Sequence, residues 1–102
     1  MSATGTHPLD FVSVVLSKCG TKFYIEVHQQ HASLFATLLG AGVYHSETCH
    51  IDNVVRRLWC HKQNLNDTMS SIVNAPRFTS LAVTINGAPF KCVVIIDQHD
   101  MF

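Results

Sequence analysis

Histidine and cysteine, two side chains that can bind metal ions, are concentrated in the middle of the chain. The four candidates for a zinc site are His45, Cys49, Cys60 and His61. Common zinc sites use Cys-x-x-Cys or His-x3-His pairs so that two ligands converge on the ion, and these four residues lack that spacing. Neighbouring residues of a helix also point about 100° apart. We therefore predict neither a metal ion nor a cofactor.

A second group of residues is basic. It consists of Arg56, Arg57, His61 and Lys62, and no acidic residue lies between Asp52 and Asp67. On a helix these side chains would form a basic face able to contact phosphates or an acidic protein. The group has only three formal charges and no free aromatic ring to stack on bases, which favours a solvated face. Nucleic-acid binding, or a zinc-associated regulatory role, through residues 45–62 is therefore the alternative interpretation.

Enzyme signatures are missing from the sequence. It contains no glycine-rich phosphate loop, no nucleophile-elbow pattern and no His-Glu-x-x-His motif. Cys19 lies in a predicted turn beside Lys18, which would lower the pKa of its thiol, but no base can be assigned to it. We predict that the protein is not an enzyme.

Two hairpins must position whatever site exists. In the first, Leu9 to Ser17 and Thr21 to His28 alternate apolar and polar residues around a turn at Cys19-Gly20. A two-residue loop makes Leu16 face Phe23, Val14 face Ile25 and Val12 face Val27, so one side of the hairpin is entirely apolar.

The second hairpin joins residues 78–85 to residues 90–96. Its loop is either Asn86-Gly87 or all four residues 86–89, and Pro89 favours the longer loop because proline cannot donate to a ladder. In both registers Leu81, Val83 and Ile85 share a face with Phe90, Cys92 and Val94. Residues 90–96 are apolar on both sides, which is typical of an interior strand.

Helical spacing appears between the hairpins. Leu34, Phe35, Leu38 and Leu39 predict a helix that starts near Gln29 or Gln30 and ends at Gly40, with a loop over 41–47. Ile51, Val54, Val55, Leu58 and Trp59 predict a second helix. Its stripe continues through Leu65, Met69, Ile72 and Val73, so residues 52–75 form one helix or two. Asn64 and Asn66 favour a break, and Pro76 ends the segment.

The predicted fold is α+β, in the order ββ-α-α-ββ. Two hairpins form a four-stranded, mostly antiparallel sheet with two or three helices packed on one face, and residues 11–16 and 90–96 are central neighbours. Residues 1–8 are expected to form a flexible arm, residues 9–97 a single domain and residues 98–102 a tail.

Low charge points to a partner. Charged residues make up 14% of the chain, against about 25% in ordinary domains, and a small domain has much surface to cover. We predict a homodimer that also binds another protein, and a dimer interface on the sheet face opposite the helices. That face would carry Phe11, Val15, Tyr24, Val93 and Ile95, or else the alternate set of strand residues.

No apolar run approaches the roughly 20 residues of a membrane span, and residues 1–8 do not have the features of a secretory signal. We therefore expect a cytoplasmic protein without membrane contact, able to diffuse into the nucleus. The amino-acid usage, with two Glu and four Lys among many Val, Thr, Ser, Cys and His, is like that of proteins encoded by animal viruses. From it we expect a viral accessory protein that acts on a host protein.

Overall fold

The computed structural model describes residues 8–48 and 53–97. The predicted tail, Cys49 and all but Pro8 of the predicted arm lie outside these residues. The strands are β1 (Phe11–Leu16), β2 (Lys22–His28), β3 (Val43–Thr48), β4 (Val55–His61), β5 (Ser80–Ile85) and β6 (Ala88–Ile96). The helices are α1 (Ala32–Leu39), flanked by the 3-10 turns Gln29–His31 and Gly40–Gly42, and α2 (Asp67–Val73).

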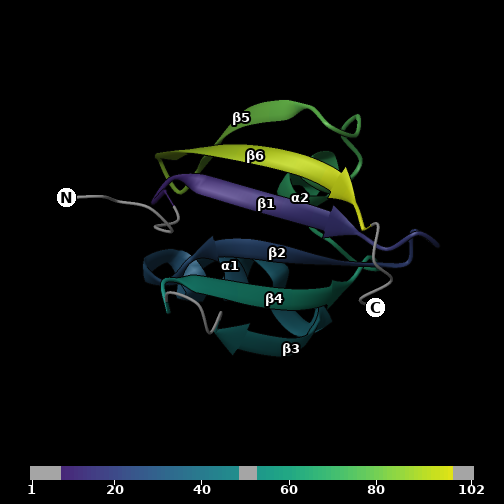
Figure 1. Ribbon diagram of the computed structural model, residues 1–102, viewed down its shortest axis with the longest axis horizontal. Helices are drawn as coiled ribbons and strands as arrows, with labels where there is room; N and C mark the ends of the chain where they lie inside the picture. The colour runs from purple at the N-terminus through teal and green to yellow at the C-terminus, as the bar shows by residue number, and fades with distance from the viewer. Residues whose placement is uncertain (1–7, 49–52, 98–102) are drawn as a thin grey trace.

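All six strands belong to one sheet in the order β3-β4-β2-β1-β6-β5 (Figure 1). β1 and β6 pair in parallel, and the other neighbouring pairs are antiparallel. The predicted four-stranded, mostly antiparallel sheet is therefore wrong, because two further strands pair at the β2 edge of the first hairpin. The expected proximity of residues 11–16 and 90–96 is confirmed, and both segments form interior strands of the sheet.

Both helices lie on the same face of the sheet, behind the strands in Figure 1. Phe35 and Leu39 of α1 and Met69, Ile72 and Val73 of α2 belong to one buried core with the apolar residues of the strands. Those strand residues are Val12, Val14, Leu16, Phe23, Ile25, Val27, Leu58, Cys60, Ile85, Phe90, Cys92 and Val94. The molecule thus has two layers, and its core lies between them.

The register of the first hairpin is confirmed: Val12 pairs with Val27, Val14 with Ile25 and Leu16 with Phe23. The second hairpin closes at Asn86-Gly87, with φ of 51° and 80°, and not over four residues. The pair Ile85–Ala88 flanks the turn, and Pro89 is the next residue of β6. Its nitrogen therefore points away from β5, and its missing N–H costs no bond to that strand.

The predicted helix from residue 51 is wrong over residues 55–61, which form β4 between β3 and β2. An interior strand carries apolar side chains on both faces, and here they fall by chance at helical spacing. Asn53 and Asn64 bracket the strand, each with a φ of 60° in the left-handed region. The choice between one helix and two over residues 52–75 is also wrong, because a strand and not a helix precedes Asn64, and α2 begins only after its N-cap Asn66.

The first helix is confirmed at its predicted place, with Gly40 at its end at a φ of 65°. The loop predicted over residues 41–47 is wrong, because Val43–Thr48 form the edge strand β3. This strand was hard to recognise because Tyr44, His45 and Ser46 are all exposed, so the apolar alternation of a half-buried strand is missing.

Candidate protein interface on the open face of the sheet

We call the side of the sheet opposite α1 and α2 the open face, since no described helix covers it. Strand alternation and the pairing registers decide which side chains belong to it. Its central members are Phe11, Ser13, Val15, Tyr24, Glu26, Glu47, Arg57, Trp59, Val93 and Ile95.

An aromatic pair lies near the centre of the open face. Tyr24 of β2 is directly opposite Trp59 of β4, and their ring centroids are 4.6 Å apart. Val15 and Ile95 pack beside them. Tyr24 and Trp59 are only 6% and 9% exposed, so this small second core is already formed within one chain.

Arg57 covers the aromatic pair. Its guanidinium carbon lies 4.5 Å from the Tyr24 ring centroid and 5.8 Å from that of Trp59, within cation–π range. Arg57 Nε also donates a 3.0 Å hydrogen bond to Glu26 Oε2, and Nη2 donates to the same oxygen. Burial alone would lower the Arg57 pKa, but its hydrogen bonds and ion pair with Glu26 outweigh burial and raise it.

Glu47 of the edge strand β3 extends this ion pair. Its Oε2 lies 3.7 Å from Arg57 Nη1, and its Oε1 lies 3.2 Å from His45 Nε2. The hydrogen bond with His45, assisted by the charge of Arg57, lowers the pKa of the Glu47 carboxyl. Glu26, Arg57 and Glu47 therefore satisfy one another within one chain, whereas Lys91, which lies opposite Phe11 on the same face, is exposed.

All five predicted interface residues, Phe11, Val15, Tyr24, Val93 and Ile95, lie on the open face. Val15 and Tyr24 are buried, and the other three are half-buried. Sequence reasoning missed Arg57 and Trp59 because it placed both on a helix. Residues 55–61 carry apolar side chains on both faces of the strand, so only the pairing of β4 with β2, which places Trp59 opposite Tyr24, identifies them.

The predicted basic face is not formed. Arg56 and Arg57 are consecutive strand residues and point to opposite faces of the sheet. Arg56 Nη1 donates a 3.2 Å hydrogen bond to Ser46 Oγ, whereas Arg57 belongs to the open face. His61 and Lys62 lie at the far end of β4, where the His61 ring packs against Tyr44 with centroids 4.6 Å apart.

The three described candidate zinc ligands, His45, Cys60 and His61, do not converge either. The Cys60 thiol is buried on the helix-covered side, where it donates to the carbonyl of His61, and burial raises its pKa to about 11. His45 pairs with Glu47 on the open face. Cys49 lies outside the described residues. Within residues 8–48 and 53–97, no cluster of three or more His, Cys, Asp or Glu side chains could hold a metal ion.

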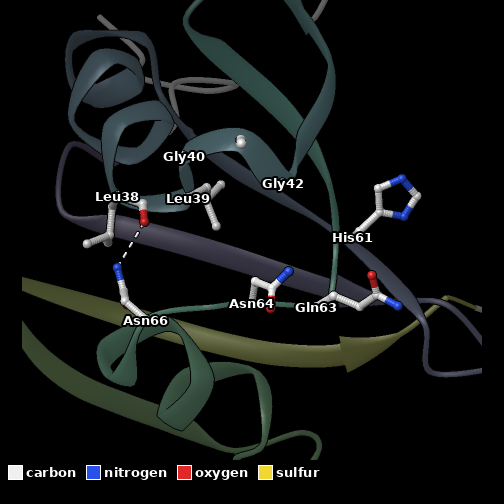
Figure 2. Close-up of a pocket in the computed structure, with 9 residues that line it drawn as sticks. Leu38, Leu39, Gly40, Gly42, His61, Gln63, Asn64 and Asn66 are labelled. Atoms are coloured by element: carbon white, nitrogen blue, oxygen red, sulfur yellow. Dashed lines mark hydrogen bonds between the residues drawn. The ribbon is translucent and has the colours of Figure 1, made fainter.

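A pocket of about 390 Å³ with both apolar and polar lining residues lies between the end of α1 and the segment that links β4 to α2. Figure 2 shows His61 and Gln63 at one end and Asn66 at the other, where Asn66 Nδ2 donates a 2.9 Å hydrogen bond to the Leu38 carbonyl. Gly42 lines the same pocket, and a Cβ there would lie 2.9 Å from Cys60 Sγ. The amides and the imidazole can exchange hydrogen bonds with a small polar molecule.

A second hollow of about 520 Å³ borders His61 and Gln63 on the side of the β1–β2 turn. Cys19 lies in this turn, where its Sγ is 3.0 Å from Thr21 Oγ1 and 3.4 Å from Ser17 Oγ. Hydrogen bonds from Ser17 and Thr21 lower the pKa of the exposed Cys19 thiol to about 7. The lowered pKa predicted from Lys18 therefore has a different cause.

Comparison with known proteins finds no matching family model, no matching curated protein and no matching solved structure. Neither described helix has the length and apolar character needed to cross a membrane.

Proposed function

We propose that this chain is a small, non-enzymatic protein–protein interaction module that acts as a homodimer through the open face of its sheet. The observation that carries the proposal is the two-layer arrangement, in which both described helices cover one face and leave half-buried apolar residues on the other. Phe11, Val93 and Ile95 are the side chains that a partner would bury further.

A second copy suits this face for electrostatic reasons. The formal net charge is zero, so two copies do not repel each other as whole molecules. Arg57 is already paired with Glu26 and Glu47, and the exposed Lys91 of the same face balances the negative charge that this group leaves over. Docking therefore leaves each of these three charges paired. An unpaired buried charge, which is the usual cost of burying a polar face, is avoided.

The face is small for a protein interface. Six strands about 4.8 Å apart and about 20 Å long make a flat area of roughly 500 Å². Because stable interfaces bury about 800 Å² on each partner, a face of this size favours a weak, reversible association. The dimer would offer its remaining surface to another protein. The three described cysteines are free thiols, and we place its action in the cytoplasm. The viral origin stays a prediction from amino-acid usage.

Light scattering of the purified protein at a few hundred micromolar tests this proposal. We expect a mass above that of the single 11.3 kDa chain for the wild type. Val93→Lys, which places an ammonium group in the middle of the open face, should lower the mass. Thr37→Lys adds the same charge on the exposed side of α1 and should not change it. A monomeric wild type, or equal masses for both variants and the wild type, would refute the proposal.

A further inference from the structure

The two edges of the sheet differ in how well they are protected against pairing with another strand. β3 is irregular between Val43 and His45, and it carries the charge of Glu47. Irregularities and charged side chains are the usual devices that block edge-to-edge association. β5 has neither, since residues 80–85 pair with β6 in unbroken register and contain no charged residue and no proline.

The turn at Asn86-Gly87 decides which backbone groups of β5 point outward. The pair that flanks a two-residue hairpin turn is hydrogen-bonded, and such pairs alternate along the ladder. Ile85, Val83 and Leu81 therefore direct their N–H and C=O groups toward β6. Ser80, Ala82 and Thr84 direct theirs away from the sheet, at an edge where the described sheet has no further strand.

Phe78, just before β5, is the second independent observation. Its side chain is 70% exposed, the highest value among the exposed large apolar residues. Its φ of 63° lies in the left-handed region, which is strained for a bulky residue, and its N–H is held by a 2.6 Å hydrogen bond to the Val94 carbonyl. This hydrogen bond fixes the backbone, but no packing among the described residues accounts for the exposed aromatic ring.

We propose that β5 is a second self-association site, at which it pairs antiparallel with β5 of another copy about a two-fold axis through Ala82. In this register Ala82 lies opposite itself and Ser80 lies opposite Thr84, so that the outward-pointing groups of all three residues are paired. On the helix side Leu81 lies opposite Val83, and these half-buried residues extend the core across the junction.

The same register explains Phe78. Because the two copies of β5 run antiparallel, the start of one strand, where Phe78 lies, comes near the hairpin turn that ends the other. Gly87 in this turn has open space where a side chain would be, with no atom within 4 Å of a Cβ built there. The exposed ring therefore has room to pack on the turn of the other copy.

A second copy fits this edge because a two-fold axis brings the same segment of both copies together, so that any charge in the segment would approach its own copy. Like charges across such an axis repel, and residues 80–85 have none. Edge pairing also leaves the open face accessible and joins two open faces into one wider surface. The inference therefore stands independently of the proposed function, and together the two interfaces predict a tetramer.

Ala82→Pro tests the edge. Proline removes the outward N–H at the two-fold axis while every hydrogen bond to β6 remains, because the bonded residues are 81, 83 and 85. Ala82→Thr is the matched control, since it keeps the N–H and favours a strand. Both are made in a Val93→Lys background, so that only the edge can associate.

Light scattering should give a dimer for Val93→Lys and Val93→Lys/Ala82→Thr, and a monomer for Val93→Lys/Ala82→Pro. Hydrogen exchange supplies the second readout: the amides of Ser80 and Thr84 should be protected in the dimers and exchange at least tenfold faster in the proline variant. An unchanged mass in the proline variant, or no protection in the Val93→Lys dimer, would overturn the inference. A monomeric Ala82→Pro single variant would instead contradict the open-face dimer and leave edge pairing intact.

Discussion

Arg57 is the residue that joins the charged and the aromatic parts of the open face. Replacing it with alanine removes the cover of the Tyr24 and Trp59 rings and leaves the Glu26 carboxylate, about one-quarter exposed, without its main partner. We expect Arg57→Ala to lower the free energy of unfolding by about 1–3 kcal/mol, the usual cost of an unsatisfied, partly buried polar group. Urea unfolding followed by tryptophan fluorescence measures this loss and also reports exposure of Trp59.

The neighbouring arginine supplies the control. Arg56 has one hydrogen bond to the exposed Ser46 hydroxyl and points to the other face. Arg56→Ala should cost less than about 1 kcal/mol and leave the Trp59 emission unchanged. Equal losses for the two variants would contradict the bridging role of Arg57.

The Cys19 thiol gives a prediction that depends on pH. Because its pKa is lowered to about 7, the thiolate fraction rises through neutral pH. We expect the rate of Cys19 alkylation to reach half its maximum near pH 7, whereas buried Cys60 and Cys92, whose pKa is raised to about 11, should react slowly. Mass-spectrometric peptide mapping after iodoacetamide treatment follows each site.

Ser17→Ala tests whether the Ser17 hydrogen bond, and not the exposure of the thiol alone, makes Cys19 reactive near pH 7. The Ser17 hydroxyl accepts the Lys22 N–H at 3.2 Å and is free to donate its own proton to Cys19 Sγ. Its loss should move the midpoint of Cys19 alkylation upward, toward the ordinary value of 9.0. A midpoint that stays in place would show that the hydroxyl does not stabilise the thiolate.

At the scale of elements, Asn66 has two separate roles. Its Oδ1 accepts the Met69 N–H at 2.8 Å and caps α2, while its Nδ2 donates to the Leu38 carbonyl at the end of α1. We expect Asn66→Ala to destabilise the fold by about 1–2 kcal/mol through loss of the cap.

Asn66→Asp distinguishes the two roles, because a carboxylate caps a helix equally well but cannot donate to a carbonyl. It should cost only about 0.5–1 kcal/mol, the value of one partly exposed hydrogen bond. Thermal unfolding of the three proteins side by side gives the comparison, and equal losses for both variants would contradict the capping role.

The predictability of each element depends on how its residues are buried. The β1–β2 register could be read from the sequence because one side of that hairpin is apolar and the other mostly polar, so a one-residue slip would reverse it. β4 offers no such contrast: Leu58 and Cys60 are buried on one face, and Val55 and Trp59 on the other. Its apolar positions therefore fit a helix as well as a strand.

Only some residues of the candidate site could be predicted from the sequence, for the same reason. Phe11, Val15, Tyr24, Val93 and Ile95 come from the three strands whose alternation or turns were clear, and they share the open face. Arg57, Trp59 and Glu47 come from β4 and β3, whose place in the sheet depends on tertiary pairing. Long-range pairing of this kind leaves no local signal in residues 43–61.

At the scale of the whole molecule, zero net charge and internally paired central charges predict an association that depends little on salt. Between about 50 and about 500 mM sodium chloride, we expect the dissociation constant to change by less than about threefold, because the contacts are apolar or between backbone groups. Sedimentation velocity over this range measures it. Binding to nucleic acid would behave in the opposite way, since release of counterions from even three phosphates weakens affinity by more than tenfold over the same range. A steep loss of association with salt would therefore show that charges such as Arg56 and Lys62, and not the open face and β5, hold the copies together.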